Sequence, residues 1–238
     1  MKLLIDLHTH TVASGHAYST WNENVKAARK HKLKVLGISE HAPMMPGSCK
    51  DIYFSNFKVL PKRVGELRVL NGMEANIYDY NGSIDVEEPV LSKLDYIIAS
   101  LHTPCIKEGT IAQNTAALIG AMRNPYVKII GHPDDDRFPV DYEELTQAAK
   151  AEKVALELNN SSINPLSARI NGEKNIRKML EKCMDHQTMI LVGTDSHYCE
   201  EVGRFKDARR ILKELDFPKE LIINEEVGRL PYVLNREL

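Results

Sequence analysis

The sequence predicts an α/β fold in which seven parallel strands alternate with helices and close into a barrel. Short apolar runs rich in Ile, Val and Leu recur seven times along the 238 residues, as is typical of strands buried on both faces of a parallel sheet. Stretches with helical periodicity lie between most of these runs, at the spacing of about thirty residues expected of βαβ units. Polar side chains follow six of the seven runs, and this third observation favours a barrel over an open sheet.

The predicted strands, in order, are LLIDL (3–7), KVLGI (34–38), LRVLNGM (67–73), DYIIASL (95–101), VKIIG (127–131), VALEL (154–158) and MILVG (189–193). The clearest helices are WNENVKAARKH (21–31), NTAALIGAMRN (114–124), YEELTQAAKAE (142–152) and KNIRKMLEKCM (174–184). Two of them follow good N-cap residues, Thr20 and Asp141. No Pro-, Gly- or Ser-rich linker divides the sequence, so we expect residues 1–238 to form a single domain.

The overall charge is nearly balanced, with 31 Lys and Arg against 33 Asp and Glu, which gives no reason to expect a nucleic-acid or membrane partner. The densest basic stretch, residues 26–34, is interpreted as a solvated helix face. The four cysteines form no CxxC pair, which argues against a disulfide framework and a thiolate zinc site. Since no apolar run has the length of a signal-peptide core or a membrane span, the expectation is a soluble, cytoplasmic protein.

The side chains that follow the strands are of the kinds that bind divalent metals. They are His8, His10, His41, Glu74, His102, His132, Asp195 and His197. Because parallel strands all point the same way, these side chains converge on the carboxyl-terminal face, where α/β enzymes place their sites. A closed barrel also brings the first and last strands together, so it explains the convergence better than an open sheet.

The spacing within the clusters points to more than one metal ion. His8 and His10 are two residues apart, which on a strand puts both imidazoles on one side, and Asp195 and His197 repeat that spacing. A zinc site takes about four ligands, so the set is too large for one ion, and two or three are implied. A single strand-end histidine is usually structural, and it is the joint occurrence that favours metal. The two other histidines, His31 and His186, are interpreted as surface residues without a role.

Several short motifs resemble the PHP (polymerase and histidinol phosphatase) family, most closely its compact bacterial YcdX-type metal-dependent phosphatases. The motifs are HTHTVASGHAYS (8–19), SEH (39–41), GMEAN (72–76), SLH (100–102), GHP (131–133), ALELNNSS (155–162) and TDSH (194–197). The resemblance implies a distorted, TIM-like (β/α)7 barrel that holds three divalent ions, most often zinc, with iron or manganese as alternatives. It also implies that relatives can form homo-oligomers, including trimers.

The same resemblance implies a distribution of ligands among the three ions. His8, His10, Glu74 and Asp195 would hold the first, and Glu74 would bridge to a second. His102 and His132 would complete the second site. The third ion would take His16, His41 and His197, which accounts for His16, a loop residue that the strand-end pattern does not place.

The expected activity is hydrolysis of small phosphomonoesters by metal-activated hydroxide at the trinuclear cluster. Asp195 and His197 are the expected catalytic residues, and the leaving-group acid stays open between Asp195 and a water on the metals. Arg169 is the candidate for binding the substrate phosphate, because a guanidinium can contact two phosphate oxygens at once. Ser161 and Ser162 could add hydrogen bonds there.

One stretch departs from the family pattern. After GHP the relatives usually carry Gly-Asn, whereas this chain carries Asp134, Asp135 and Asp136. Three carboxylates would discourage multiply charged substrates unless they point outward. We expect them to form a solvated loop that leads to the helix at 142–152.

Four alternative functions stay open. A histidinol-phosphate phosphatase could use the same cluster, and a PHP module that has lost catalysis could still bind metal. A phosphodiesterase or proofreading nuclease is disfavoured by the balanced charge and the lack of a basic-aromatic stripe. A metal-dependent amidohydrolase would use two metals bridged by a lysine or carboxylate, and the larger ligand set fits three better.

Overall fold

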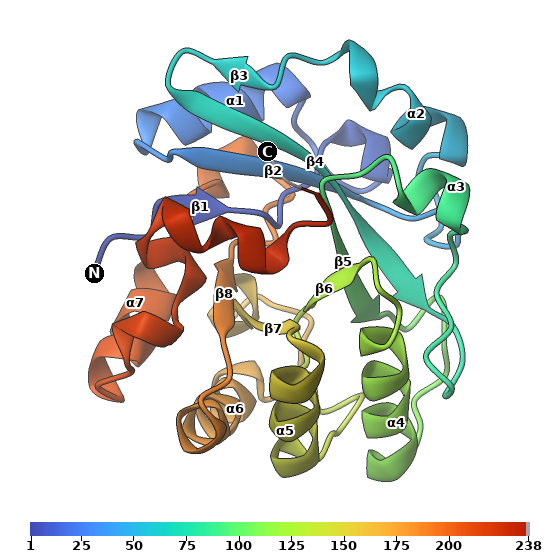
Figure 1. Cartoon of the computed structure of the whole chain (residues 1–238), viewed down its shortest axis with the longest axis vertical. Coiled ribbons are helices and arrows are strands. Elements are labelled where there is room, and N and C mark those ends of the chain that lie inside the picture. Colours follow the sequence, from blue (N-terminus) through green and yellow to red (C-terminus); the bar gives the residue numbers. More distant parts are fainter. Residues whose placement is uncertain (237–238) are drawn as a thin grey trace.

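The computed structural model describes residues 1–236 and shows a nearly closed barrel of parallel strands surrounded by helices (Figure 1). The barrel strands, in sheet order, are β1 (Ile5–Asp6), β2 (Val35–His41), β4 (Leu67–Ile77), β5 (Tyr96–Leu101), β6 (Val127–Ile130), β7 (Ala155–Asn159) and β8 (Ile190–Gly193). All seven predicted strands and their parallel order are therefore confirmed. A two-residue strand that the sequence did not predict, β3 (Arg63–Val64), pairs antiparallel with the start of β4.

The four predicted helices are present, and three shorter ones were not predicted. The predicted helices are α1 (Trp21–Lys30), α4 (Ile111–Met122), α5 (Tyr142–Glu152) and α6 (Gly172–His186). The unpredicted ones are α2 (Asp51–Ser55), α3 (Glu88–Leu91) and α7 (Lys206–Glu214). Both predicted N-caps are confirmed, because Thr20 forms a capping box with Glu23, and the Asp141 side chain accepts from the amides of Glu143 and Glu144. In Figure 1, α4, α5 and α6 lie side by side along one flank of the barrel.

The seam between β1 and β8 explains why the barrel is distorted. Between these strands, the Asn224 side-chain amide donates to the carbonyls of Ile5 (2.7 Å) and Val192 (2.8 Å), and its oxygen accepts from the Val192 amide (2.7 Å). Beyond their carboxyl ends, the segments that follow the two strands meet directly, since the His10 amide donates to the Ser196 carbonyl (2.8 Å). One side chain thus takes the place of part of a strand ladder, and the ring closes unevenly.

The apolar core has two layers. The larger layer lies between the strands and the surrounding helices, and the smaller one fills the barrel. A 3-10 helix near the C-terminus, η7 (Val227–Val233), contributes Leu230 and Val233 to the inner layer. Figure 1 shows this segment, in red, lying across the ring of strands. The inner layer is therefore covered from one end, and the polar side chains gather at the other.

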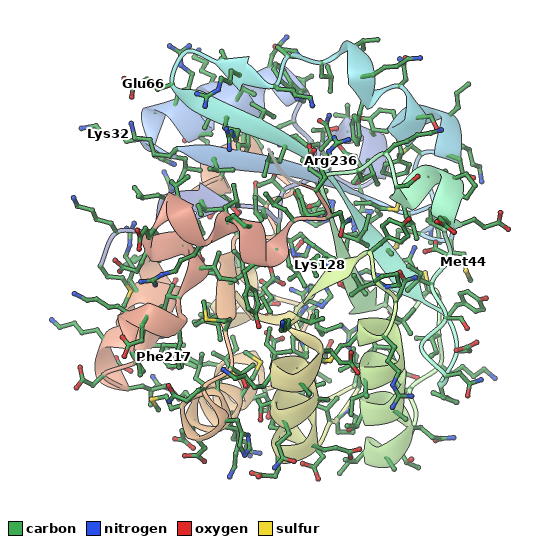
Figure 2. The ribbon with its side chains drawn as sticks, in the orientation of Figure 1. Lys32, Met44, Glu66, Lys128, Phe217 and Arg236 are labelled. Atoms are coloured by element: carbon green, nitrogen blue, oxygen red, sulfur yellow. The ribbon has the colours of Figure 1, made fainter. Side chains whose placement is uncertain are left out.

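The surface follows the charge pattern of the sequence. All five Lys and Arg residues in the basic stretch 26–34 are exposed, which confirms it as a solvated face. Figure 2 shows Lys32 and Glu66 projecting outward on this side of the molecule, and Lys34 forms an ion pair with Glu66 at 2.7 Å. Among the described residues, no helix combines the length and the apolar character needed to cross a membrane.

The tight packing of Tyr96 inside the barrel leads to a stability prediction. Its ring lies against Gly37 and Gly72, and a Cβ placed on Gly72 would lie 2.2 Å from the ring. We expect Gly72→Ala to lower the free energy of unfolding by about 1–3 kcal/mol, because a well-packed core accepts extra atoms only by shifting. Urea denaturation of metal-free protein measures this change. Gly228→Ala is the control, since a Cβ there meets its nearest neighbour at 3.4 Å, and an equal loss in both variants would contradict the argument.

Candidate metal centre

The nine side chains predicted as metal ligands lie together at the carboxyl ends of the barrel strands. His41 ends β2, Glu74 lies within β4, and all the others except His16 follow β1, β5, β6 and β8 within a few residues. The loop residue His16 also joins them, because its Nε2 lies 3.0 Å from Nε2 of His197. The predicted convergence is therefore observed for the whole set, which is His8, His10, His16, His41, Glu74, His102, His132, Asp195 and His197.

Glu74 is completely buried, and each of its two oxygens faces a different pair of imidazoles, with His41 as a further neighbour of Oε2. Its Oε2 lies 3.3 Å from His8 Nε2 and 3.5 Å from His10 Nε2. Its Oε1 lies 3.2 Å from His102 Nε2 and 2.8 Å from His132 Nε2. This is the arrangement of a carboxylate that could bridge two metal ions.

Asp195 completes the first of these groups. Its Oδ1 lies 3.5 Å from His8 Nε2 and 3.3 Å from His10 Nε2, while its Oδ2 accepts a hydrogen bond from Arg169 at 2.8 Å. The residue has a φ of +50°, in the left-handed region that aspartate adopts more readily than most residues. Backbone in this region is often found where a functional side chain has to be aimed.

The third group consists of the histidines nearest the mouth. The ring centroid of His16 lies 4.9 Å from that of His41 and 4.7 Å from that of His197. The loop that carries His16 packs closely against the backbone of Gly47. A Cβ on Gly15 would lie 2.4 Å from the Gly47 carbonyl oxygen, so a side chain at position 15 would force the two segments apart. His41 also approaches the other groups, since its Nδ1 lies 2.7 Å from Glu74 Oε2, so the three groups form one continuous cluster.

Several of the nitrogen and oxygen atoms that could bind a metal ion are buried without a hydrogen-bond partner. They are His8 Nε2, His10 Nε2, both ring nitrogens of His41, and Glu74 Oε2; His41 Nδ1 and Glu74 Oε2 are close but not aligned for a hydrogen bond. Buried polar atoms are costly unless they are paired, and these all face one centre. Groups of three donor atoms within 4.8 Å of one another occur four times in the cluster. Imidazole and carboxylate donors in such groups fit zinc and similar divalent ions.

Hydrogen bonds behind the rings fix which nitrogen of each imidazole faces the centre. Ser14 donates to Glu40 (2.6 Å), so its oxygen accepts from His10 Nδ1 (3.1 Å). The side-chain oxygen of Asn76 (Oδ1) likewise accepts from His102 Nδ1 at 2.7 Å. Both imidazoles therefore carry their proton on Nδ1 and leave the Nε2 lone pair free, as a metal ligand requires.

The charges in the cluster also suit a cation. Burial, together with the imidazoles of His41 and His197, holds the pKa of His10 well below its usual range. Burial would also lower the pKa of His8, but the surrounding carboxylates, foremost Glu157 and Glu74, outweigh it and raise that pKa well above its ordinary value. His10 thus offers a free lone pair, and the negative charge around His8 attracts a positive charge.

A cleft of about 500 Å³ opens beside the cluster, between the loops that follow β5, β6, β7 and β8. His102, His132, Asp195 and His197 form part of its wall. Arg169 also lines it, with one guanidinium nitrogen 2.8 Å from Asp195 Oδ2 and another 3.3 Å from Ser162 Oγ. The predicted phosphate-binding arginine therefore lies at the cleft, but it is already paired with a predicted ligand.

The expectation of a solvated loop at the three aspartates is wrong for two of them. Asp134 is fully buried, which raises its pKa to about 7, and Asp135 is 8% exposed. Asp135 accepts from Nε of Arg137 (2.8 Å) and from the Ile170 amide (3.2 Å), so it binds the segment beside Arg169. Only Asp136 is exposed. Long-range contact with residues after β7, which the local sequence does not reveal, accounts for the burial.

The two remaining histidines lie away from the cluster, as predicted, but both are partly buried and have structural partners. His186 Nδ1 lies 2.8 Å from Thr146 Oγ1 and its Nε2 lies 3.0 Å from Glu143, so it links α6 to α5. His31 Nδ1 donates to the Val202 carbonyl at 2.5 Å. The interpretation of both as surface residues without a role is corrected on this point.

Other side chains of the centre were not predicted as functional. Glu157, Ser14, Asn76 and Asn159 stand behind the ligands rather than among them. The only sequence signal for them is that they fall inside the family-like stretches 8–19, 72–76 and 155–162. Spacing rules find residues that face a common centre, and they do not find the residues that orient those ligands.

An α/β barrel with imidazoles and carboxylates gathered at the carboxyl ends of its strands has the architecture of a barrel metalloenzyme. The family model of the PHP domain matches residues 6–161. The chain belongs to the PHP family.

Relatives and a solved structure agree with this assignment. A probable phosphatase of Clostridium novyi is 46% identical over 230 residues, covering 97% of this chain and 93% of that protein. A probable phosphatase of Clostridium botulinum is 45% identical over 237 residues, covering 99% and 96%. The crystal structure of a Lactococcus lactis histidinol phosphate phosphatase, in complex with zinc, L-histidinol and phosphate, superposes with a TM-score of 0.61. It is 17% identical and covers 91% of this chain and 95% of that one, which confirms the TIM-like fold.

Proposed function

We propose that this chain is a metal-dependent phosphoesterase that hydrolyses small phosphomonoesters at a centre of three divalent ions. The observation that carries the proposal is the set of buried, unpartnered imidazole nitrogens around Glu74, whose two oxygens face two separate histidine pairs. The probable phosphatases that share 45–46% identity with the chain support the reaction class.

The donors divide into three ligand sets. His8, His10, Glu74 and Asp195 would hold the first ion, with Glu74 shared. The second would be completed by His102 and His132, and the third held by His16, His41 and His197. Zinc fits the mixed imidazole and carboxylate donors best, and iron or manganese could replace it. Bound there, the ions would make a water nucleophilic at neutral pH and offset the charge of the phosphoryl oxygens.

The chain's own residues would then position the phosphate and the catalytic groups. Arg169 uses two guanidinium nitrogens on Asp195 and Ser162, which leaves further N–H donors for phosphate oxygens. Asp195 presents Oδ1 to the imidazoles while Arg169 holds its Oδ2. His197 is oriented by the Asp195 carbonyl, 3.0 Å from its Nδ1, and also lines the cleft. We assign catalytic roles to Asp195 and His197 on this basis.

Histidinol phosphate is a second candidate substrate, because carboxylates line the cleft beyond the metal ligands. Glu201 and Asp207 contribute to this wall beside Arg137 and Arg204, and their carboxylates would contact a leaving group that carries a positive charge. Comparison of kcat/KM for histidinol phosphate with that for sugar phosphates and nucleotides separates the two specificities. Rescue of a histidine auxotroph by the chain would favour histidinol phosphate.

The proposal is tested by metal analysis and a substrate panel on the same protein. We expect elemental analysis of purified protein to give close to three divalent ions per chain, and the loaded protein to hydrolyse phosphomonoesters. A metal content near one per chain would contradict the trinuclear centre. Metal-loaded protein that is inactive on the whole panel would instead favour a PHP module without catalysis.

The proposed role of Arg169 predicts a change in substrate affinity. We expect Arg169→Ala to raise KM for a phosphomonoester roughly 10- to 100-fold, because a hydrogen bond to a charged group contributes about 1.5–3 kcal/mol. Inhibition by inorganic phosphate should weaken by a similar factor. Steady-state kinetics measure both. Arg204→Ala is the matched control, because Arg204 also lines the cleft, and equal effects in the two variants would remove the specific role of Arg169.

A further inference from the structure

Among the seven barrel strands, β7 alone ends without a predicted metal ligand, yet it carries a fully buried carboxylate at Glu157. Building on the proposed function, we propose that Glu157 is a positioning residue shared by the first and second metal groups. It would hold the His8 imidazole and the His132 backbone from behind, so that both groups depend on one carboxylate. This role would explain why β7 carries a buried carboxylate although no predicted metal ligand follows it.

The contacts of Glu157 join the two groups directly. Its Oε1 lies 2.8 Å from His8 Nδ1, and its Oε2 accepts from the His132 amide at 2.9 Å. The Asn159 side chain donates to Oε2 as well, at 3.1 Å. His8 belongs to the group with His10, and His132 to the group around Glu74 Oε1, so the carboxylate reaches both.

The neighbouring strand leaves space for this carboxylate. Gly193, at the end of β8, follows Ile190, Leu191 and Val192, and a Cβ on it would lie 1.9 Å from Glu157 Oε1. A side chain at position 193 would therefore displace the carboxylate from His8. This close approach is a separate observation from the hydrogen bonds, and it supports the carboxylate position that they define.

The arrangement has two effects on the ligands. A carboxylate at Nδ1 keeps the proton of His8 on that nitrogen and increases the basicity of Nε2, which faces Glu74 at 3.3 Å. At His132, which has a φ of +29°, the bond to the amide holds an unusual backbone conformation that aims Nε2 at Glu74 Oε1. Glu74 thus links the two groups on the metal side, and Glu157 links them on the opposite side.

The test is metal binding by metal-free protein, measured by competition with a chromophoric zinc chelator. We expect Glu157→Gln to weaken zinc binding at two sites per chain by roughly 10- to 100-fold, the range found when partners of ligating histidines are removed. The third site, formed by His16, His41 and His197, should keep its affinity. Asp6→Asn is the matched control, because Asp6 is equally buried but its carboxylate accepts from backbone amides and the Thr194 hydroxyl rather than from an imidazole ring.

The outcomes separate this inference from the proposed function. If the wild-type chain binds no zinc, the proposed function fails; if it binds three and Glu157→Gln binds them equally well, only the role of Glu157 fails. Weakening at one site alone would also overturn the shared role. Should the variant not fold, nitrogen NMR of the zinc-loaded wild type still decides, since His8 must carry its proton on Nδ1. A His8 protonated on Nε2 would contradict the inference.

Discussion

Glu74→Gln is expected to lower kcat/KM for phosphomonoesters on the order of 10³-fold, about 4 kcal/mol of transition-state stabilisation. The reason is that one charged carboxylate faces two imidazole pairs through different oxygens, at 2.8–3.5 Å. Burial opposes its ionisation, but His8 and His102 outweigh this and hold the pKa of Glu74 well below its usual range. An amide of the same shape removes the negative charge from both groups together. Elemental analysis should show the loss of at least one ion per chain along with the activity.

The matched control for Glu74→Gln is Asp95→Asn at the other end of the barrel. Asp95 is 1% exposed and accepts from the Asn71 amide at 2.8 Å, with no imidazole among its partners. The control should lose stability but keep its metal content and its specific activity. If Glu74→Gln retained all its metal and near-normal turnover, the bridging role would be wrong.

Elements with a clear apolar pattern could be predicted from the sequence. The seven strands are short apolar runs, and the helices predicted at 142–152 and 174–184 are long periodic stretches, the first with a recognisable N-cap at Asp141. The convergence of the ligand residues could also be predicted, because the carboxyl ends of parallel strands lie on the same face of the barrel. In contrast, α7 buries only Ala208, Ile211 and Leu212, and so short a pattern among charged residues gives a weak signal.

Features that depend on contacts between distant residues could not be predicted. Asn224 closes the seam between β1 and β8, and nothing in its local sequence marks it as a substitute for a strand. Glu157 lies between Leu156 and Leu158, and its local sequence indicates only that it is part of a strand. The structure shows that it contacts His8, 149 positions away. Asp134 is buried beside Ser162 and Arg169, which follow β7 and lie far from it in the sequence. The ligands are found by a pattern of spacing, while the residues that orient them are found only in three dimensions.

Asp195→Asn is expected to reduce kcat/KM on the order of 10³-fold and also to destabilise the metal-free protein. The loss of activity follows from Oδ1, which faces His8 and His10. The loss of stability follows from Oδ2, which pairs with Arg169, a side chain only 16% exposed. Removal of one partner of a buried pair costs about 3–5 kcal/mol, and the lower end applies here because Glu157 still contributes negative charge near the guanidinium.

A second substitution separates these two effects. Adding Arg169→Met to Asp195→Asn removes the charge left unpaired, so the double variant should recover most of the stability in urea denaturation. It should not recover activity, because Oδ1 is still missing and the proposed phosphate contact is gone as well. A double variant as unstable as Asp195→Asn would mean that the ion pair does not account for the loss. Recovery of turnover with stability would instead show that Asp195 serves the fold alone and has no part in the chemistry.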